Sequence, residues 1–227
     1  MINPFLASSL LFLVAYLLGS LPTGYLLGKY IKGIDIREYG SGSTGATNVL
    51  RILGKPAGIT ALVIDLLKGM MAVTFGVPVA SALAKGIYLA DFNPFPETWK
   101  PWLVTLAGIG AVIGHSKSVF LNFSGGKSVA TSLGVLLMMS PAVGLGTLGS
   151  FLAVLGVSRI VSLSSITGAI IVTFLMIFLK QPLPYILFAA VAGIYVIVRH
   201  RSNIDRLIAG TEPRLGQKLE ENLTAEP

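Results

Sequence analysis

The 227-residue chain contains no cysteine, only 2 histidines and only 10 acidic residues. The absence of cysteine excludes a disulfide framework, a cysteine-ligated zinc site and a thioester-enzyme intermediate. A metal centre built by the protein needs clustered His, Asp or Glu ligands, which this composition does not favour. The sequence therefore predicts neither a metal nor a cofactor.

Charge is also scarce, and long hydrophobic runs take its place. Charged residues make up 12% of the chain and hydrophobic residues 53%, and the mean hydropathy is +0.79. A helix crosses a bilayer core with about 20 apolar residues. Uncharged stretches of roughly this scale cover 1–28, 69–84, 101–116, 128–158, 160–179 and 181–198. We predict an all-α integral membrane protein, in which the first stretch stays as a helix because it lacks the basic segment of a secretory signal.

The uncharged stretch 128–158 is too long for one short span, and the segment Pro141–Gly146 interrupts its helix periodicity. We therefore predict two short helices there and about seven transmembrane helices in all. The predicted spans are 5–28, 56–84, 101–116, 127–140, 143–158, 163–179 and 184–199.

The positions of Lys and Arg predict the orientation of these spans. With the N-terminus outside and the C-terminus in the cytoplasm, most basic residues lie inside, and only Lys85, Lys100 and Lys180 lie outside. A single long helix over 128–158 would reverse the basic C-terminal tail. We predict one membrane domain over 1–213 and a polar cytoplasmic tail over 214–227.

Residues 122–131 read NFSGGKSVAT and look like part of a nucleotide-binding P-loop. A complete P-loop needs a glycine at the position of Leu121, so only half of the motif is present. The two glycines still allow backbone N–H groups to turn toward an anion, and a following helix would point its positive end there. The alternative is a flexible turn with a cytoplasmic lysine. The residues that we expect to bind phosphate are Gly125, Gly126, Lys127 and Ser128.

A second loop is dense in small and hydroxyl-bearing residues. Residues 40–48 read GSGSTGATN. Glycines free the backbone and hydroxyls supply donors, so this stretch can wrap an anion. A flexible linker is the alternative, but linkers seldom carry cations on both sides of such an array, here Arg37 and Arg51. The expected binding residues are Gly40, Ser41, Gly42, Thr47 and Asn48, together with Arg51.

Two further polar groups lie within or beside predicted spans. Asp65 and Lys68 are three residues apart, so on a helix they share a face and neutralise each other, in a functional or a purely structural role. Arg159, Ser162 and Ser165 recur at intervals of three, which would align a cation with hydroxyls along one helix edge. The alternative for this second group is a helix-terminal cation beside ordinary serines.

The segment after the last predicted span begins with His200 and Asn203, one helical turn apart, and reaches Glu212. His200 and Asp205 also match His-x-x-x-x-Asp, a pattern of soluble-headed acyltransferases in which the carboxylate orients a histidine base. Residues five apart on a helix point about 140° from each other, so we treat Asp205 as incidental. His200 and Asn203 form the expected functional pair.

Taken together, these motifs resemble the bacterial acylphosphate-dependent glycerol-3-phosphate acyltransferases of the PlsY type. The resemblance covers nearly the whole chain, and one departure is Ser43, where the family usually has Asn. The segments that carry it are 19–24, 35–37, 40–48 with Arg51, 65–69, Gly114 and His115, 123–131, Arg159 with Ser162 and Ser165, and 200–204 through Glu212.

The resemblance implies an enzyme of the bacterial plasma (inner) membrane whose active site faces the cytoplasm. It would transfer an acyl chain from acyl phosphate to the sn-1 hydroxyl of glycerol 3-phosphate, giving lysophosphatidic acid and phosphate in the first step of phospholipid synthesis. Ser41 and Arg51 would contact the acyl-phosphate group and the developing oxyanion, and Lys127 would neutralise phosphate charge. The catalytic set is completed by His200 and Asn203, which would align the acceptor.

The resemblance also implies a substrate-binding set and a supporting set. The base stays open between His200 and a substrate phosphate oxygen. Beyond the catalytic residues, the binding set is Gly40, Gly42, Thr47, Asn48, Gly125, Gly126, Ser128, Thr131, Arg159, Ser162 and Ser165. The supporting set is Asp65, Lys68 and Glu212.

Two other classes of protein fit parts of the sequence less well. A transporter for a phosphorylated small molecule would share the spans and the intramembrane charges, but such proteins usually show paired halves, and the sequence has no such symmetry. A nucleic-acid or lipid-headgroup binding protein would gather basic residues on one stripe, whereas here they are spread over separate loops. We expect membrane lipid as a partner and no nucleic acid.

Overall fold

The structure is a computed structural model that describes residues 4–88 and 97–217. Within these ranges the chain is helical and has no strand, only an isolated bridge between Ser118 and Ser124. The predicted all-α class is confirmed. The helices are α1 (Pro4–Ser20), α2 (Thr23–Lys32), α3 (Ala46–Leu53), α4 (Lys55–Tyr88), α5 (Lys100–Ser116), α6 (Val129–Met139), α7 (Pro141–Ser158), α8 (Val161–Phe178), α9 (Leu183–Arg199) and α10 (Arg201–Ile208).

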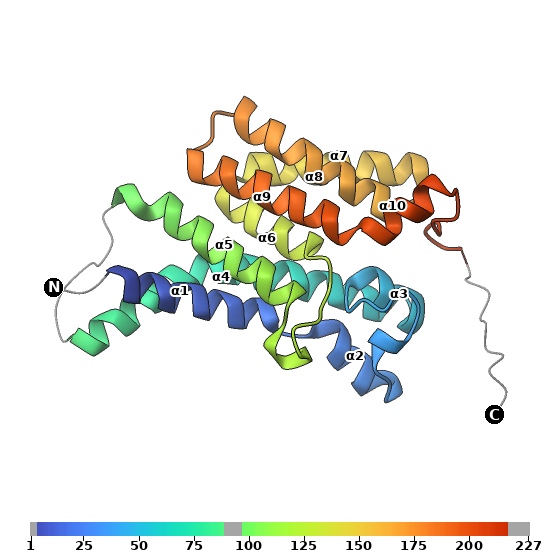
Figure 1. Ribbon diagram of the computed structural model, residues 1–227, viewed down its shortest axis with the longest axis horizontal. Coiled ribbons are helices and arrows are strands. Elements are labelled where there is room, and N and C mark those ends of the chain that lie inside the picture. Colours follow the sequence, from blue (N-terminus) through green and yellow to red (C-terminus); the bar gives the residue numbers. More distant parts are fainter. Residues whose placement is uncertain (1–3, 89–96, 218–227) are drawn as a thin grey trace.

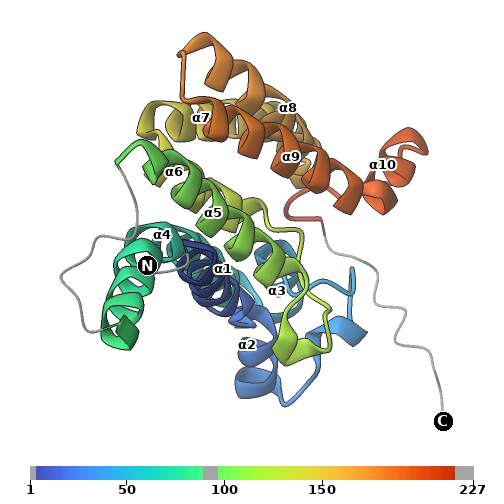
Figure 2. The same cartoon turned by 60° about the vertical axis from the view of Figure 1, so that its left-hand side comes forward.

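The helices form two groups with α5 and α6 between them. Figures 1 and 2 both place α7, α8 and α9 together on one side and α1, α2 and α4 on the other. Close approach requires glycine at several contacts. A Cβ on Gly134 of α6 would lie 2.1 Å from the backbone oxygen of Leu66 in α4, and one on Gly114 of α5 would lie 2.2 Å from that of Tyr16 in α1. These contacts fix the site-bearing ends of the helices relative to each other.

Several helices are long and apolar enough to cross a bilayer. Among the described residues, 4 helical stretches meet this condition, or 5 if the bent pair α9–α10 is one span, while α6 is a shorter apolar helix. The predicted interruption before Pro141 is confirmed, since α6 ends at Met139 and α7 begins at Pro141. The total of seven spans and the orientation of the termini stay predictions, and residues 218–227 of the predicted tail lie outside the described residues.

Two predictions near polar residues need refinement. The predicted first span 5–28 lies within the apolar stretch Phe5–Lys32, which is long enough to cross a membrane, but its helix has a short break between α1 and α2. The break falls at Pro22, which has no N–H to donate and disfavours helical geometry at the residue before it. The predicted loop with Thr47, Asn48 and Arg51 is in part the helix α3, whose capping residue Gly45 is extended. Thr47, Asn48 and Arg51 therefore lie on a short helix, and only residues 40–45 of the predicted segment form a loop.

Candidate active site

A cavity of about 530 Å³ lies between α3, α4, α6, α7, α8 and α9, and its two ends differ in chemistry. The polar end is lined by Arg51, Lys127, Ser162, His200, Asn203 and Glu212. The apolar end is lined by Leu133, Leu136, Leu148, Phe151, Val172 and Phe188. The cavity therefore joins a cationic, hydrogen-bonding chamber to a hydrocarbon-lined chamber.

Asn48 organises the first loop from within. Its side-chain oxygen accepts from the backbone N–H of Ser41 at 2.9 Å, and its amide nitrogen donates to the backbone oxygens of Ile36, Tyr39 and Ser43 at 2.9–3.2 Å. Asn48 is 1% exposed, and these contacts occupy both ends of its amide. Although it lines the cavity, its contacts are those of a loop scaffold.

The residues of this loop separate into cavity-lining and exposed positions. Ser43, Thr47 and Arg51 line the polar end. The expected residues 40–42, Gly40 through Gly42, are exposed and lie outside the lining. Gly40 and Gly42 have φ of 60° and 66°, which favours glycine, so the glycines are explained by the backbone of the turn and not by contact with the cavity.

The loop with Gly125 and Gly126 is clamped from both sides. The Gly126 N–H donates to the His115 backbone oxygen at 3.2 Å, so this N–H does not point into the cavity, contrary to the predicted anion cradle. Nη2 of Arg199 donates to the carbonyl oxygens of both glycines at 3.3 and 3.2 Å. A Cβ on Gly126 would lie 2.2 Å from Nε2 of His115. The glycines thus permit close packing that positions the next residue, Lys127.

Ser128 and Thr131 are both buried, but within the described part of the chain only the Ser128 hydroxyl has hydrogen-bond partners. The Ser128 side chain is 1% exposed, donates to the Val112 backbone oxygen at 2.8 Å and bonds to the Ser116 hydroxyl. Thr131 is fully buried outside the cavity lining, with its backbone oxygen against Gly69 of α4. Of these two, only Ser128 borders the cavity, and its hydroxyl holds the start of α6 against α5.

Lys127, Asn203 and Glu212 form the centre of the polar end. The ammonium of Lys127 donates to the side-chain oxygen of Asn203. Glu212 accepts from Asn203 at 2.6 Å and from the Ser162 hydroxyl at 2.7 Å, and its other oxygen accepts from Arg206 at 2.7 Å. The chain thus brings residues from four separate segments into one hydrogen-bonded network.

Charge and burial oppose each other in this network. Burial alone would raise the pKa of Glu212, but hydrogen bonds from Asn203, Ser162 and Arg206 outweigh it and hold the pKa below its ordinary value. Lys127 lies before α6, outside that helix, and burial lowers the pKa of its ammonium to about 8, although Glu212 acts in the opposite direction. The carboxyl group of Glu212 therefore stays ionised, whereas the ammonium of Lys127 loses its proton as the pH rises through about 8.

His200 is held so that one ring nitrogen is available. The residue is 3% exposed and stands at the break between α9 and α10, where the chain bends by 60°. Its Nδ1 lies 2.7 Å from the backbone oxygen of Val196. A carbonyl oxygen can only accept, so Nδ1 carries the proton and Nε2 of the neutral ring keeps its lone pair. Since His200 lines the cavity, this arrangement supplies a base or acceptor at the polar end.

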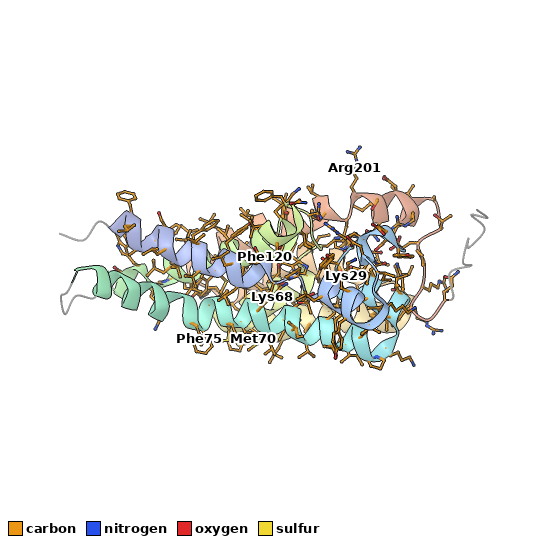
Figure 3. All side chains as sticks on the ribbon, turned by 90° about the horizontal axis from the view of Figure 1, so that it is seen from below. Lys29, Lys68, Met70, Phe75, Phe120 and Arg201 are labelled. Carbon is orange, nitrogen blue, oxygen red and sulfur yellow. The ribbon has the colours of Figure 1, made fainter. Side chains whose placement is uncertain are left out.

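A buried charged cluster lies behind the clamped loop. Asp65 pairs with Lys68 at 2.9 Å, and Nδ1 of His115 lies 3.6 Å from the same carboxylate oxygen. Lys68 also donates to the backbone oxygen of Leu21 at 2.9 Å, at the break between α1 and α2. Figure 3 shows Lys68 within the bundle, whereas Phe75 projects outward from α4. Asp65 and His115 border the cavity, while Lys68 ties α4 to α1.

The predicted group of Arg159, Ser162 and Ser165 is divided. Ser162 and Ser165 line the cavity, and the Ser165 hydroxyl donates to the Val161 backbone oxygen at 2.9 Å. Arg159 is exposed outside the lining, and its backbone oxygen accepts from the Leu215 N–H at 2.6 Å. Its conformation, with φ of 59°, ends α7. Arg159 thus fastens the segment after Glu212 and does not border the cavity.

Two residues that position the loop received no role in the sequence analysis, although His115 was among the residues that carry the resemblance. Arg199 reaches glycines more than 70 positions earlier in the chain, and His115 packs against Gly126 from α5. Arg199 reads as an ordinary basic residue at a helix end, and only its place beside His200 hinted at the site. Within the described residues no group of three or more His, Cys, Asp or Glu side chains is placed to hold a metal ion.

Comparison with known proteins identifies the family of this chain. The sequence profile of the family described as glycerol-3-phosphate acyltransferase matches residues 9–210. A glycerol-3-phosphate acyltransferase of Crocosphaera subtropica is 59% identical over 217 residues, which cover 96% of this chain and 98% of the relative. The fold is similar to the crystal structure of PlsY in its glycerol 3-phosphate form, with a TM-score of 0.80 and 37% identity over 92% of this chain and 96% of that one.

A second crystal structure of PlsY, in a lysophosphatidic acid form, gives a TM-score of 0.77 and 36% identity, with 92% of this chain and 95% of that one covered. The fold and the two-ended cavity thus define a multi-pass membrane acyltransferase. The chain belongs to the PlsY family of glycerol-3-phosphate acyltransferases.

Proposed function

We propose that the protein transfers an acyl chain from acyl phosphate to the sn-1 hydroxyl of glycerol 3-phosphate, giving lysophosphatidic acid and inorganic phosphate. The observation that carries the proposal is the single cavity that joins a cationic end to an apolar end. Such a cavity fits a reaction between a small phosphorylated alcohol and a lipid chain. The relatives support the acceptor, because they are glycerol-3-phosphate acyltransferases by name and PlsY has been crystallised in a glycerol 3-phosphate form.

In the proposed reaction the acceptor hydroxyl oxygen attacks the acyl carbonyl carbon, and the bond from that carbon to the phosphate oxygen breaks. The electron pair leaves with inorganic phosphate, and the hydroxyl proton passes to a base. Acyl phosphate already contains a good leaving group, so alignment and charge neutralisation supply most of the catalysis. No covalent enzyme intermediate is needed.

Each charged residue of the polar end then has a role. Lys127 and Arg51 neutralise substrate phosphate, while Glu212 fixes the Asn203 amide that faces Lys127. His200 offers Nε2 to the acceptor hydroxyl, directly as base or as an acceptor that aligns it for a phosphate oxygen. Ser41 is exposed outside the lining of the cavity, and we assign its hydroxyl to the acyl-phosphate group on the family resemblance.

The location of the enzyme follows from the same proposal. Basic residues gather at the end of the bundle that carries the polar end of the cavity, and Figure 3 shows Lys29 and Arg201 toward that end. By the positive-inside rule this end faces the cytoplasm. We place the protein in the bacterial inner membrane, where a water-soluble acceptor enters from the cytoplasm and the acyl donor from the lipid.

A donor comparison tests the proposal. Purified protein is given labelled glycerol 3-phosphate with acyl phosphate, with acyl-CoA or with an acyl carrier protein thioester, and the position of the acyl group in the product is determined. We expect 1-acylglycerol 3-phosphate from acyl phosphate alone. Product from a thioester but not from acyl phosphate, or acylation at the sn-2 position, would contradict the proposal.

A further inference from the structure

We infer that the apolar end of the cavity sets the acyl-chain length that the enzyme prefers, through four residues that each come from a different helix. These residues, called the floor below, are Leu136 of α6, Thr147 of α7, Val172 of α8 and Phe188 of α9. All four are between 2% and 9% exposed. The inference rests on the proposed function, because it requires an acyl chain in the apolar end.

The depth of the cavity fits the chain of a membrane lipid. Along α8, the lining runs from Ser162 at the polar end to Val172, which at the rise of an α-helix is about 15 Å. Along α9 it runs from His200 to Phe188, about 18 Å on the same basis. Half of a typical hydrocarbon core is also about 15 Å thick. The floor therefore lies where the end of an acyl chain of ordinary lipid length would arrive.

Closely packed side chains lie behind the floor, so the floor residues have little room to move away from the cavity. Met139, Val143 and Met176 are at most 7% exposed and belong with Leu136, Val172 and Phe188 of the floor to one buried cluster. The ring of Phe188 also rests against α5, because a Cβ on Gly108 would lie 3.0 Å from its Cε2. Close-packed interiors resist added volume, so a chain that reaches the floor meets a fixed wall.

Above the floor, small residues make room for the chain. Gly168 of α8 lines the cavity between Ser165 and Val172. A Cβ on Gly168 would lie 3.5 Å from Cγ2 of Thr147, an ordinary van der Waals distance, so a side chain can begin there without a clash at its first atom. That side chain would occupy space that the cavity now leaves open between α7 and α8.

Fit at the floor, and not hydrophobicity, then decides between chain lengths. Lipid tails are as apolar as Leu, so a longer chain gains little when it passes from the bilayer into the cavity. An overlong chain must overpack the floor, and a short chain leaves a void above it. Overpacking of this kind corresponds to discrimination on the order of tenfold.

Two variants change the depth of the apolar end of the cavity in opposite directions. Phe188→Ala deepens the cavity, and Gly168→Val shortens it. Phe174→Ala is the matched control, because Phe174 is a large apolar residue of α8 that is 68% exposed and lies away from the cavity. Each protein receives a mixture of saturated acyl phosphates that differ by two methylenes, and product ratios are measured by mass spectrometry at saturating glycerol 3-phosphate.

We expect Phe188→Ala to shift the product ratio toward longer chains and Gly168→Val toward shorter chains, each on the order of tenfold, while Phe174→Ala keeps the wild-type profile. If Phe188→Ala does not fold, the shift of Gly168→Val still decides the inference. An unchanged profile in a folded, active variant would overturn it and would indicate that the chain leaves the cavity sideways into the bilayer. Wild-type protein that uses no acyl phosphate of any length would instead refute the proposed function itself.

Discussion

Lys127 shows how the chemistry of a single residue depends on its neighbours. Its ammonium contacts Asn203, and burial lowers its pKa to about 8 despite the nearby carboxylate of Glu212. The sequence could predict a cation at this position, since Gly-Gly-Lys is a phosphate-binding pattern. It could not predict the lowered pKa, because the burial comes from segments far away in the chain.

We predict that the lowered pKa limits activity in alkaline solution. Above about pH 8 the free enzyme loses the positive charge of Lys127, so kcat/KM for glycerol 3-phosphate should fall as pH rises through this value. In Lys127→Arg the guanidinium stays protonated, and the alkaline fall should disappear even if the maximal rate is lower. The measurement is kcat/KM against pH for both proteins. The same fall in Lys127→Arg would assign the titration to another group.

At the scale of elements, the sequence predicted helices well and their junctions poorly. The predicted break at Pro141 is confirmed because proline and glycine act locally. The helix α3 was missed because eight residues with Gly before and after resemble a loop, and its stability comes from packing of Val49 on Ala57 and Ala61 of α4. Propensity is local, whereas such packing is not.

The loop with Gly125 and Gly126, between α5 and α6, gives the prediction at this scale with the largest expected effect on activity. In Gly126→Ala the new methyl would meet the His115 ring at 2.2 Å, so the loop must shift and carry Lys127 with it. We expect kcat/KM for glycerol 3-phosphate to fall on the order of 10²-fold, with KM for acyl phosphate near normal. Gly149→Ala is the control, because a Cβ there meets nothing within 4 Å. Equal kinetics of the two variants would show that the loop is only a turn.

At the scale of the whole molecule, the fold gathers polar residues from distant segments at one end of an apolar bundle. Ser43, Lys127 and Glu212 come from three different loops and line one cavity. The motifs named several residues that line this cavity, but they also included residues 40–42, Gly125, Gly126, Thr131 and Arg159, which lie outside the lining. These residues belong to the same sequence runs as lining residues, and a linear pattern cannot tell which side of a turn or helix end faces the cavity.

The orientation of the bundle gives a prediction that single cysteines can test, because the chain has no cysteine of its own. Thr98, before α5, and Ser202, in α10, are both exposed and lie toward opposite ends of the bundle. In sealed right-side-out vesicles, a membrane-impermeant thiol reagent should label Thr98→Cys at once and Ser202→Cys only after permeabilisation. Labelling of Ser202→Cys in sealed vesicles would place the polar end of the cavity outside.

The central claim is that the acyl group passes directly between two bound substrates. Ser41 is then a hydrogen-bond donor, and loss of one such donor should lower kcat on the order of 10²–10³-fold in a folded Ser41→Ala protein. The most direct measurement is mass spectrometry of the intact wild-type protein after incubation with acyl phosphate alone. We predict an unmodified mass and no burst of phosphate. An acyl adduct on Ser41 that disappears when glycerol 3-phosphate is added would contradict direct transfer.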